Sequence, residues 1–328
     1  MDPVAALLEI ASLLERERAS RYRAKAFRAA AAALQDLPDD IAADPTRLRA
    51  VKGIGESTFA VIRQAQSGEV PQYLVELRGD VEPEIVSVLR SKLRGDLHAH
   101  TDWSDGTTSI AVMAEAARAL GHEYQAVTDH SPRLRVARGL SAERLRAQIP
   151  LVRAESREGF TMLAGIEVDI LDEGALDQDD DLLAELDIVV ASVHSHLRMD
   201  SRPMTARMIA AVSNPRVNVL GHCTGRLVEG ERGTRAQSTF DAAAVFAACA
   251  ENGVAVEINS RPERQDPPDE LIAIALDAGC LFSIDSDAHA PGQLSLLDHG
   301  AQRAERAGVP AGRIITTWGL ERLLAWAE

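Results

Sequence analysis

Six of the nine histidines in this 328-residue chain stand in short clusters that recur over almost two hundred residues. Three carboxylates occupy equivalent places, which gives nine candidate metal ligands. They are His98, His100, Asp105, His130, Glu167, His194, His222, Asp287 and His289. Because one ion takes about four to six protein or water ligands, the set predicts two or three divalent ions. Mixed imidazole and carboxylate ligands suit Mn, Zn or Fe better than Mg, and together they indicate a multinuclear hydrolase.

The candidate ligands follow short, apolar, β-branched runs that are typical of buried parallel strands. These runs cover residues 124–128, 162–170, 187–193, 217–221, 254–259 and 281–285. Helix-like stretches lie between them, for example 110–120, 141–158 and 239–251. The alternation predicts an α/β fold, either a parallel barrel or a doubly wound sheet, in which ligands collect at the carboxyl ends of the strands.

Length and charge place limits on the rest of the chain. One barrel of about 250 residues leaves room for a second, smaller unit. The net charge of −15 divides into −1 for residues 1–92 and −14 for residues 93–328, which argues against tight, non-specific DNA binding by the barrel alone. Without an apolar run of about 18 residues or a signal-like start, we expect a soluble, cytoplasmic protein with no membrane partner.

The first ninety residues have a different character. Amphipathic patterns over 4–14, 22–34 and 46–50 predict a compact helical domain at residues 1–90. Within it, Lys52-Gly53-Ile54-Gly55 predicts a tight turn before a helix, where outward-facing N–H groups would bind DNA phosphate. We therefore predict Lys52, Gly53 and Gly55 as DNA-phosphate contacts. The alternative is a plain turn between two helices in a protein-interaction domain.

Seven motifs follow one another in residues 93–328. They are Asp96-Leu-His-Ala-His100 with Asp105-Gly106, Ala126-Val-Thr-Asp-His-Ser131, Gly165-Ile-Glu-Val-Asp169, Ala191-Ser-Val-His194, Leu220-Gly-His-Cys-Thr-Gly-Arg226, Glu257-Ile-Asn259 and Ser286-Asp-Ala-His289. This series resembles the PHP (polymerase and histidinol phosphatase) superfamily, and most closely the PHP domain of bacterial family X DNA polymerases. The segment with the glycine turn resembles the helix-hairpin-helix domain of the same polymerases.

The resemblance implies a distorted seven-stranded (β/α) PHP barrel with three divalent ions. By analogy, His98, His100, Glu167 and Asp287 would hold the first ion. Glu167 would bridge to a second ion on His194 and His222, while Asp105, His130 and His289 would hold a third. A metal-activated hydroxide would attack phosphorus in line. We assign Arg226, Asp287 and His289 to catalysis, Arg226 as a fork for a phosphate oxygen, with Arg261 and Arg264 as weaker candidates.

Family X polymerases place a nucleotidyltransferase domain between these two parts, but here about fifteen residues separate them, so we expect no polymerase activity. The leading hypothesis is a metal-dependent phosphoesterase acting on DNA, as a 3′-5′ exonuclease or a 3′-end or abasic-site processing enzyme. A small-molecule phosphomonoesterase of histidinol-phosphatase type is the alternative. A non-enzymatic DNA-binding or scaffold protein with structural metals is a third hypothesis. The sequence leaves the oligomeric state and the role of His196 open.

Overall fold

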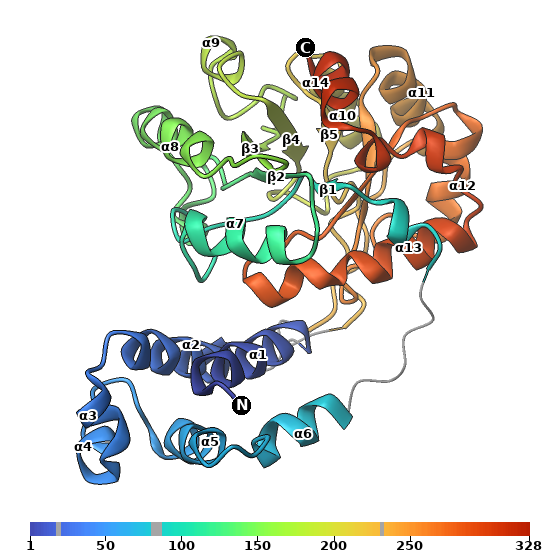
Figure 1. The fold of residues 1–328 in the computed structure, drawn as a ribbon. Coiled ribbons are helices and arrows are strands. Elements are labelled where there is room, and N and C mark those ends of the chain that lie inside the picture. Colours follow the sequence, from blue (N-terminus) through green and yellow to red (C-terminus); the bar gives the residue numbers. More distant parts are fainter. Residues whose placement is uncertain (18–20, 80–86, 230–232) are drawn as a thin grey trace. The chain divides into compact units, whose positions relative to one another are not determined.

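The computed structural model describes residues 1–17, 21–79, 87–229 and 233–328 (Figure 1). The chain divides into two compact units. Unit 1 comprises Met1–Ile85 with Pro291–Gln293, and unit 2 comprises Val86–Ala290 with Leu294–Glu328. Among the described residues, no helix has both the length and the apolar character needed to cross a membrane.

Unit 1 is built from helices. They are α1 (Pro3–Arg16), α2 (Arg21–Gln35), α3 (Asp39–Ala43), α4 (Pro45–Arg49), α5 (Glu56–Gln66) and α6 (Gln72–Gly79). In α1 the buried residues Leu7, Ile10 and Leu14 recur at helical spacing and form one apolar stripe. This stripe packs into a core that also contains Phe27 of α2 and Ile62 of α5. The predicted all-helical domain is confirmed, although α3 and α6 were not predicted.

Unit 2 contains one parallel sheet whose seven strands follow the chain order, β1-β2-β3-β4-β5-β6-β7. The strands are β1 (Gly95–Asp96), β2 (Tyr124–Val127), β3 (Thr161–Asp169), β4 (Ile188–Ser192), β5 (Val219–Leu220), β6 (Ala255–Asn259) and β7 (Phe282–Asp285). Six of these strands match the apolar runs of the sequence. The two-residue β1 lacks such a run and was expected only from the family resemblance.

Helices surround the strands on the outside (Figure 1). They are α7 (Ile110–Ala119), α8 (Ala142–Ala154), α9 (Asp180–Leu183), α10 (Ser201–Val212), α11 (Ala242–Asn252), α12 (Asp269–Asp277), α13 (Leu297–Arg306) and α14 (Leu320–Ala327). Short 3₁₀ turns lie at Arg90–Lys92, Arg135–Ala137, Pro291–Leu296, Ala311–Arg313 and Ile315–Thr317. The distorted seven-stranded (β/α) barrel is confirmed.

The seam between β1 and β7 closes the barrel mainly through side chains. Beyond the two strands, the His100 N–H donates to the Ala288 carbonyl over 2.7 Å. Before that point the Leu97 N–H donates to Asp285 Oδ1 over 2.9 Å, and the Ser286 N–H donates to Asp96 Oδ1 over 3.1 Å. Carboxylate oxygens thus take the place of ladder carbonyls at this seam.

Gly165 in β3 tests the packing between neighbouring strands. A Cβ at this position would lie 2.7 Å from the Ile188 carbonyl oxygen and 3.0 Å from Thr128 Cγ2, so Gly165→Ala must push strands apart. We expect a loss of about 1–3 kcal/mol in the free energy of unfolding. All three tryptophans of the chain lie in unit 2, so tryptophan fluorescence during urea unfolding follows this unit.

Gly312→Ala is the matched control, because nothing lies within 4 Å of its added Cβ. We expect this variant to stay within about 0.5 kcal/mol of the parent chain. Equal stability of the two variants would contradict the close approach of β3 to its neighbours.

Candidate metal centre

The barrel gathers all nine predicted ligands at the carboxyl ends of its strands. His98 and His100 follow β1, His130 follows β2, Glu167 lies near the end of β3, His194 follows β4, His222 follows β5, and Asp287 and His289 follow β7. Asp105 comes from the loop between β1 and α7. This end of a parallel barrel is where loops from successive strands converge. Residues almost two hundred positions apart therefore share one site.

Glu167 lies at the centre of the group and is 1 % exposed. Five imidazoles approach its two carboxylate oxygens. The nitrogen-to-oxygen distances are 3.3 Å for His98, 3.6 Å for His100, 2.8 Å for His130, 3.2 Å for His194 and 2.8 Å for His222. A carboxylate with one oxygen near each of two groups of histidines has the arrangement needed to bridge two ions.

Two further carboxylates complete the site. Asp287 Oδ1 lies 3.5 Å from His100 Nε2 and 3.5 Å from His289 Nδ1. Asp105 Oδ1 lies 3.5 Å from His130 Nε2 and 3.3 Å from His289 Nε2. Asp105 therefore stands between two imidazoles, as the predicted third site requires.

Among the described residues, potential ligand atoms form three sets, and within each set the atoms lie no more than 4.8 Å from one another. They are His98, His100 and Asp287; His130, Glu167 and His194; and His100, Asp105, His130 and His289. The sets overlap with the three predicted sites but differ from them: Glu167 is not in the set with His98, and His222 is in none of the three. His130 lies close enough to serve the second site as well as the third, and His100 lies close enough to serve the first and the third. The assignment of individual ligands to individual ions remains a prediction.

A second layer of carboxylates orients the imidazoles. Glu257 Oε1 lies 2.6 Å from His98 Nδ1, and its Oε2 accepts from the His222 N–H over 2.6 Å. Asp169 Oδ1 lies 2.8 Å from His194 Nδ1. Such contacts fix the ring orientation and leave the other ring nitrogen to face the centre.

Asp129 supports a loop next to the ligand cluster. Its carboxylate accepts hydrogen bonds from the Thr101 N–H over 2.8 Å, the Thr101 hydroxyl over 2.5 Å and Gln148 Nε2 over 2.6 Å. The Ser104 hydroxyl also donates to it. Asp129 therefore holds the loop that carries Asp105.

Several buried polar atoms of the site have no hydrogen-bond partner among the described residues. They are His98 Nε2, both ring nitrogens of His100, Asp105 Oδ1, His130 Nδ1, both carboxylate oxygens of Glu167, and His222 Nδ1. Leaving such atoms buried and unpaired is costly, and native proteins rarely do so. These atoms are metal-ligand types, so the residues fit bound divalent ions.

The electrostatics of the site agree with this interpretation. Burial alone would raise the pKa of Glu167, but the imidazoles around it, His194 first, hold that pKa well below its usual value. Burial opposes protonation of His98, yet Glu167 and Glu257 raise its pKa well above the usual value. Burial, with help from His289, lowers the pKa of His100 to about 3. Glu167 is thus ionised and His100 neutral, which are the forms that bind metal, whereas His98 would have to lose its proton when an ion binds.

The three candidate arginines differ in their contacts. Arg226 Nε donates to the backbone carbonyls of Arg264 and Gln265 over 3.0 and 2.9 Å, so its guanidinium braces a loop. Arg264 Nε donates to Asp287 Oδ2 over 3.0 Å, and Arg261 Nη1 donates to the Asp287 carbonyl over 2.9 Å. Arg261 and Arg264 therefore border the ligand cluster directly, whereas the catalytic role of Arg226 stays a prediction.

In unit 1, Gly53 and Gly55 lie in the turn between α4 and α5. Gly53 has a φ of +98°, which favours glycine, and Ile54 packs into the core. The Gly55 N–H donates to the Thr58 hydroxyl over 2.9 Å, so this N–H is already paired, contrary to our expectation that it faces outward for phosphate. Lys52 is exposed beside the turn.

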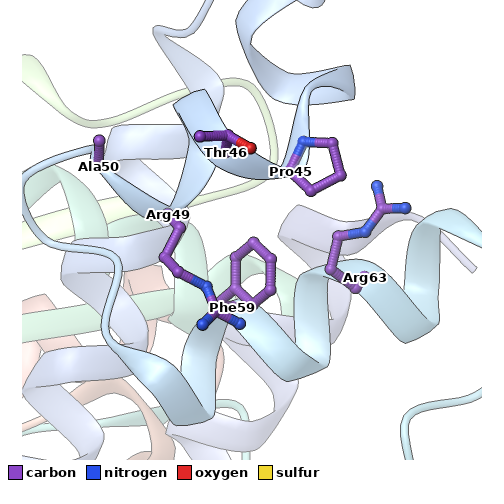
Figure 2. A pocket seen from close by; sticks show the side chains of 6 residues that line it. All are labelled: Pro45, Thr46, Arg49, Ala50, Phe59 and Arg63. Carbon is purple, nitrogen blue, oxygen red and sulfur yellow. The ribbon is translucent and has the colours of Figure 1, made fainter.

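An open hollow of about 730 Å³ lies between α4 and α5 (Figure 2). Pro45, Thr46, Arg49, Ala50, Phe59 and Arg63 line it. Figure 2 shows the Phe59 ring between the two arginines, and the Arg49 guanidinium carbon lies 4.3 Å from the ring centroid. Helices α4 and α5 thus present the positive charges of Arg49 and Arg63, in addition to Lys52 beside the hairpin turn.

The chain matches two known protein families. The PHP domain matches residues 96–261, half of the chain. The chain belongs to the PHP family. As a PHP protein with this ligand cluster, it is a metal-dependent phosphoesterase. A helix-hairpin-helix domain matches residues 1–68 of the same chain.

The chain is similar to proteins of two kinds. The DNA polymerase/3′-5′ exonuclease PolX of Bacillus subtilis is 37% identical over 239 residues, which cover 72% of this chain and 41% of that protein. The chain therefore spans less than half of PolX. A probable phosphatase of Thermoanaerobacter sp. is 29% identical over 237 residues, 69% of this chain and 91% of that protein. Histidinol phosphate phosphatase of Lactococcus lactis, solved with zinc, L-histidinol and phosphate, is 18% identical with a TM-score of 0.46, over 66% of this chain and 94% of that one.

Four carboxylates of the site were not predicted as functional residues, namely Glu257, Asp169, Asp96 and Asp285. A signal for them existed, because residues two apart on a strand face the same side. Each lies two positions from a ligand or from a residue that contacts one. Asp96, for example, precedes His98 by two residues, and Asp169 follows Glu167 by two.

Substituting the central carboxylate tests the PHP site. Glu167→Gln removes the charge that faces five imidazoles, so we expect it to lose at least one bound divalent ion per chain. Metal content after dialysis, measured by mass spectrometry, checks this result. Glu173→Gln makes the same change on an exposed residue soon after β3 and should leave metal content unaltered. Full metal occupancy in Glu167→Gln would refute the bridging role.

Proposed function

We propose that the chain is a metal-dependent phosphoesterase that acts on DNA, as a 3′-5′ exonuclease or a 3′-end or abasic-site processing enzyme. One observation carries this proposal: a full PHP ligand cluster and a helix-hairpin-helix domain stand in the same chain. The 37% identity over 239 residues to a DNA polymerase/3′-5′ exonuclease adds support. We propose no polymerase activity for this chain.

The nine ligands would hold two or three ions of Mn, Zn or Fe, because their donors combine imidazole and carboxylate. Bound ions of this kind activate water as a nucleophile near neutral pH and neutralise charge on phosphate oxygens. The Glu167 carboxylate lies at the centre of the imidazoles. Glu257 and Asp169 hold the rings of His98 and His194 in place.

Arginine side chains supply the phosphate contacts in this proposal. Arg264 is 16% exposed and pairs with Asp287 through Nε, and Arg261 is 14% exposed and lies 3.2 Å from His289 Nδ1. The Nη groups of Arg264 have donors left for phosphate oxygens next to the ligand cluster. Arg261 has fewer, because it also pairs with Glu263 over 2.7 Å. A phosphate bound there would lie between the arginines and the ions.

Unit 1 would dock the DNA backbone. Lys52, Arg49 and Arg63 supply exposed or partly exposed positive charge around the hairpin turn. The acidic Glu56 reduces that charge, because Arg49 pairs with it over 3.2 Å. The contact would therefore be weak and sensitive to salt, which suits transient docking of successive DNA ends.

A small phosphomonoester is the second candidate substrate. The acidic balance of residues 93–328 favours it, since a compact monoester needs no long basic track. The probable phosphatase of Thermoanaerobacter sp. also matches the chain over most of its own length. Under this alternative, unit 1 would serve assembly or protein interaction.

Metal-stripped protein resupplied with Mn provides the main test. We expect stepwise shortening of 5′-labelled single-stranded or 3′-recessed DNA, and no shortening before metal is returned. Asp287→Ala should lower the rate at least 100-fold, because it removes a ligand that also anchors Arg264. Intact DNA alongside ready turnover of a small phosphomonoester would favour the second candidate.

Charge reversal at the hairpin turn tests DNA docking. Lys52→Glu should weaken binding of a short duplex several-fold at 50 mM salt, and the salt dependence of its binding constant should become shallower. Lys92→Glu makes the same charge change at an exposed residue of unit 2 and serves as the control. Fluorescence anisotropy across a salt series gives both values. Unchanged binding by Lys52→Glu would leave the hairpin without a docking role.

A further inference from the structure

A second feature adjoins the ligand cluster on the side of His194. A pocket of about 270 Å³ is lined by residues of the loops that follow β2, β3 and β4. Its lining includes Arg133, Leu134, Leu171, His194 and His196. Ligand pockets usually span about 300–1,000 Å³, so this one suits a single small group such as one nucleoside.

His196 is held over this pocket by its surroundings. Its Nδ1 lies 2.9 Å from Asp172 Oδ1, and its φ of +51° is in the left-handed region that few residues other than glycine adopt. A backbone outlier of this kind, beside a site, is grounds for a functional hypothesis. Because a carboxylate only accepts, Nδ1 donates to Asp172, and Nε2 of the neutral ring is left as an acceptor.

The walls of the pocket are fixed from behind by Arg207, which is 1% exposed. Its Nε donates to the Ile170 carbonyl over 3.1 Å, and its Nη1 donates to the Ser195 carbonyl over 3.0 Å. The loop after β2, which forms the remaining wall, is also held in place, because the Arg133 N–H donates to Asp177 Oδ2 over 2.5 Å. The loops thus form a prearranged cavity.

The two carboxylates of the lining face its histidines, Asp169 facing His194 and Asp172 facing His196. The rest of the lining has the chemistry of a nucleoside subsite. Leu134 and Leu171 offer apolar surface to a base, and His196 Nε2 offers an acceptor to a sugar hydroxyl. Arg133 is exposed at the rim, and among the described residues no carboxylate lies within ion-pair distance of its guanidinium.

We propose that this pocket binds the 3′-terminal nucleoside of the substrate strand, with its base against Leu134 and Leu171 and its 3′-hydroxyl donating to His196 Nε2. This inference rests on the proposed DNA phosphoesterase function and specifies which part of the strand enters the site. It gives His196 a positioning role and assigns it no part in the chemical step.

Nucleotide binding tests the subsite without requiring turnover. Calorimetric titration of the full chain with Mn compares thymidine 5′-monophosphate, its 2′,3′-dideoxy analogue and inorganic phosphate. We expect the nucleotide to bind at least tenfold more tightly than phosphate. The dideoxy analogue should bind about fivefold more weakly than the nucleotide, which is the size of one neutral hydrogen bond.

Two variants test whether these differences in affinity arise in the pocket. His196→Gly keeps the left-handed backbone accessible and should bind the nucleotide and its dideoxy analogue equally. Leu134→Trp fills the cavity and should bind the nucleotide no more tightly than phosphate, with phosphate affinity unchanged. Arg135→Ala, an exposed residue outside the pocket lining, is the control and should match the parent chain.

The outcomes separate the subsite from the proposed function. Equal affinity of the parent chain for nucleotide and phosphate would overturn the subsite, as would a nucleotide preference that both variants retain. Failure to shorten DNA, with the nucleotide preference present and lost in both variants, would overturn the DNA substrate and leave the subsite standing. Loss of phosphate binding in Leu134→Trp would mean a damaged ligand cluster and would also count against the subsite.

Discussion

The structure of unit 2 depends on one buried carboxylate, Glu167, that faces five imidazoles. A carboxylate at 1% exposure is stable only when opposite charge or hydrogen bonds surround it. The barrel meets this requirement by bringing histidines from four other strand ends to the same place. The parallel arrangement of the strands and the second layer of Glu257 and Asp169 keep these groups together.

Two more buried carboxylates, Asp96 and Asp285, lie in the barrel beside the ligand cluster. Burial raises the pKa of Asp96 to about 6, and burial together with Asp96 raises the pKa of Asp285 well above its usual value. These two carboxylates lie at the seam between β1 and β7 and precede the ligands His98 and Asp287 by two residues each. The groups that close the barrel and the groups that would hold ions therefore belong to the same short segments.

Much of this arrangement could be predicted from the sequence. The alternation of apolar runs and helical stretches predicted the parallel sheet, and the placement of His98 through His289 at strand ends predicted that they meet. Strand β1 could not be found by pattern, because its two residues, Gly95 and Asp96, provide no periodicity. The contacts of Arg226 with backbone carbonyls could not be predicted. They depend on the direction of a side chain in an irregular segment, where the spacing of residues does not indicate which way a side chain points.

The hairpin region shows the same limit. Glycine spacing predicted the turn and the inward packing of Ile54, which depend on backbone sterics. It could not show that the Gly55 N–H donates to the Thr58 hydroxyl, because this hydrogen bond depends on the orientation of a side chain in the first turn of α5.

The seam between β1 and β7 has a thermodynamic consequence for the whole protein. Few ladder bonds hold it, and ligands from both of its sides, His98 and His100 on one and Asp287 on the other, face the same set of donor atoms. An ion bound there would join the first strand to the last, and its binding free energy would add directly to the stability of the closed barrel. Metal supply would then govern the lifetime of the folded chain against proteases as well as its activity.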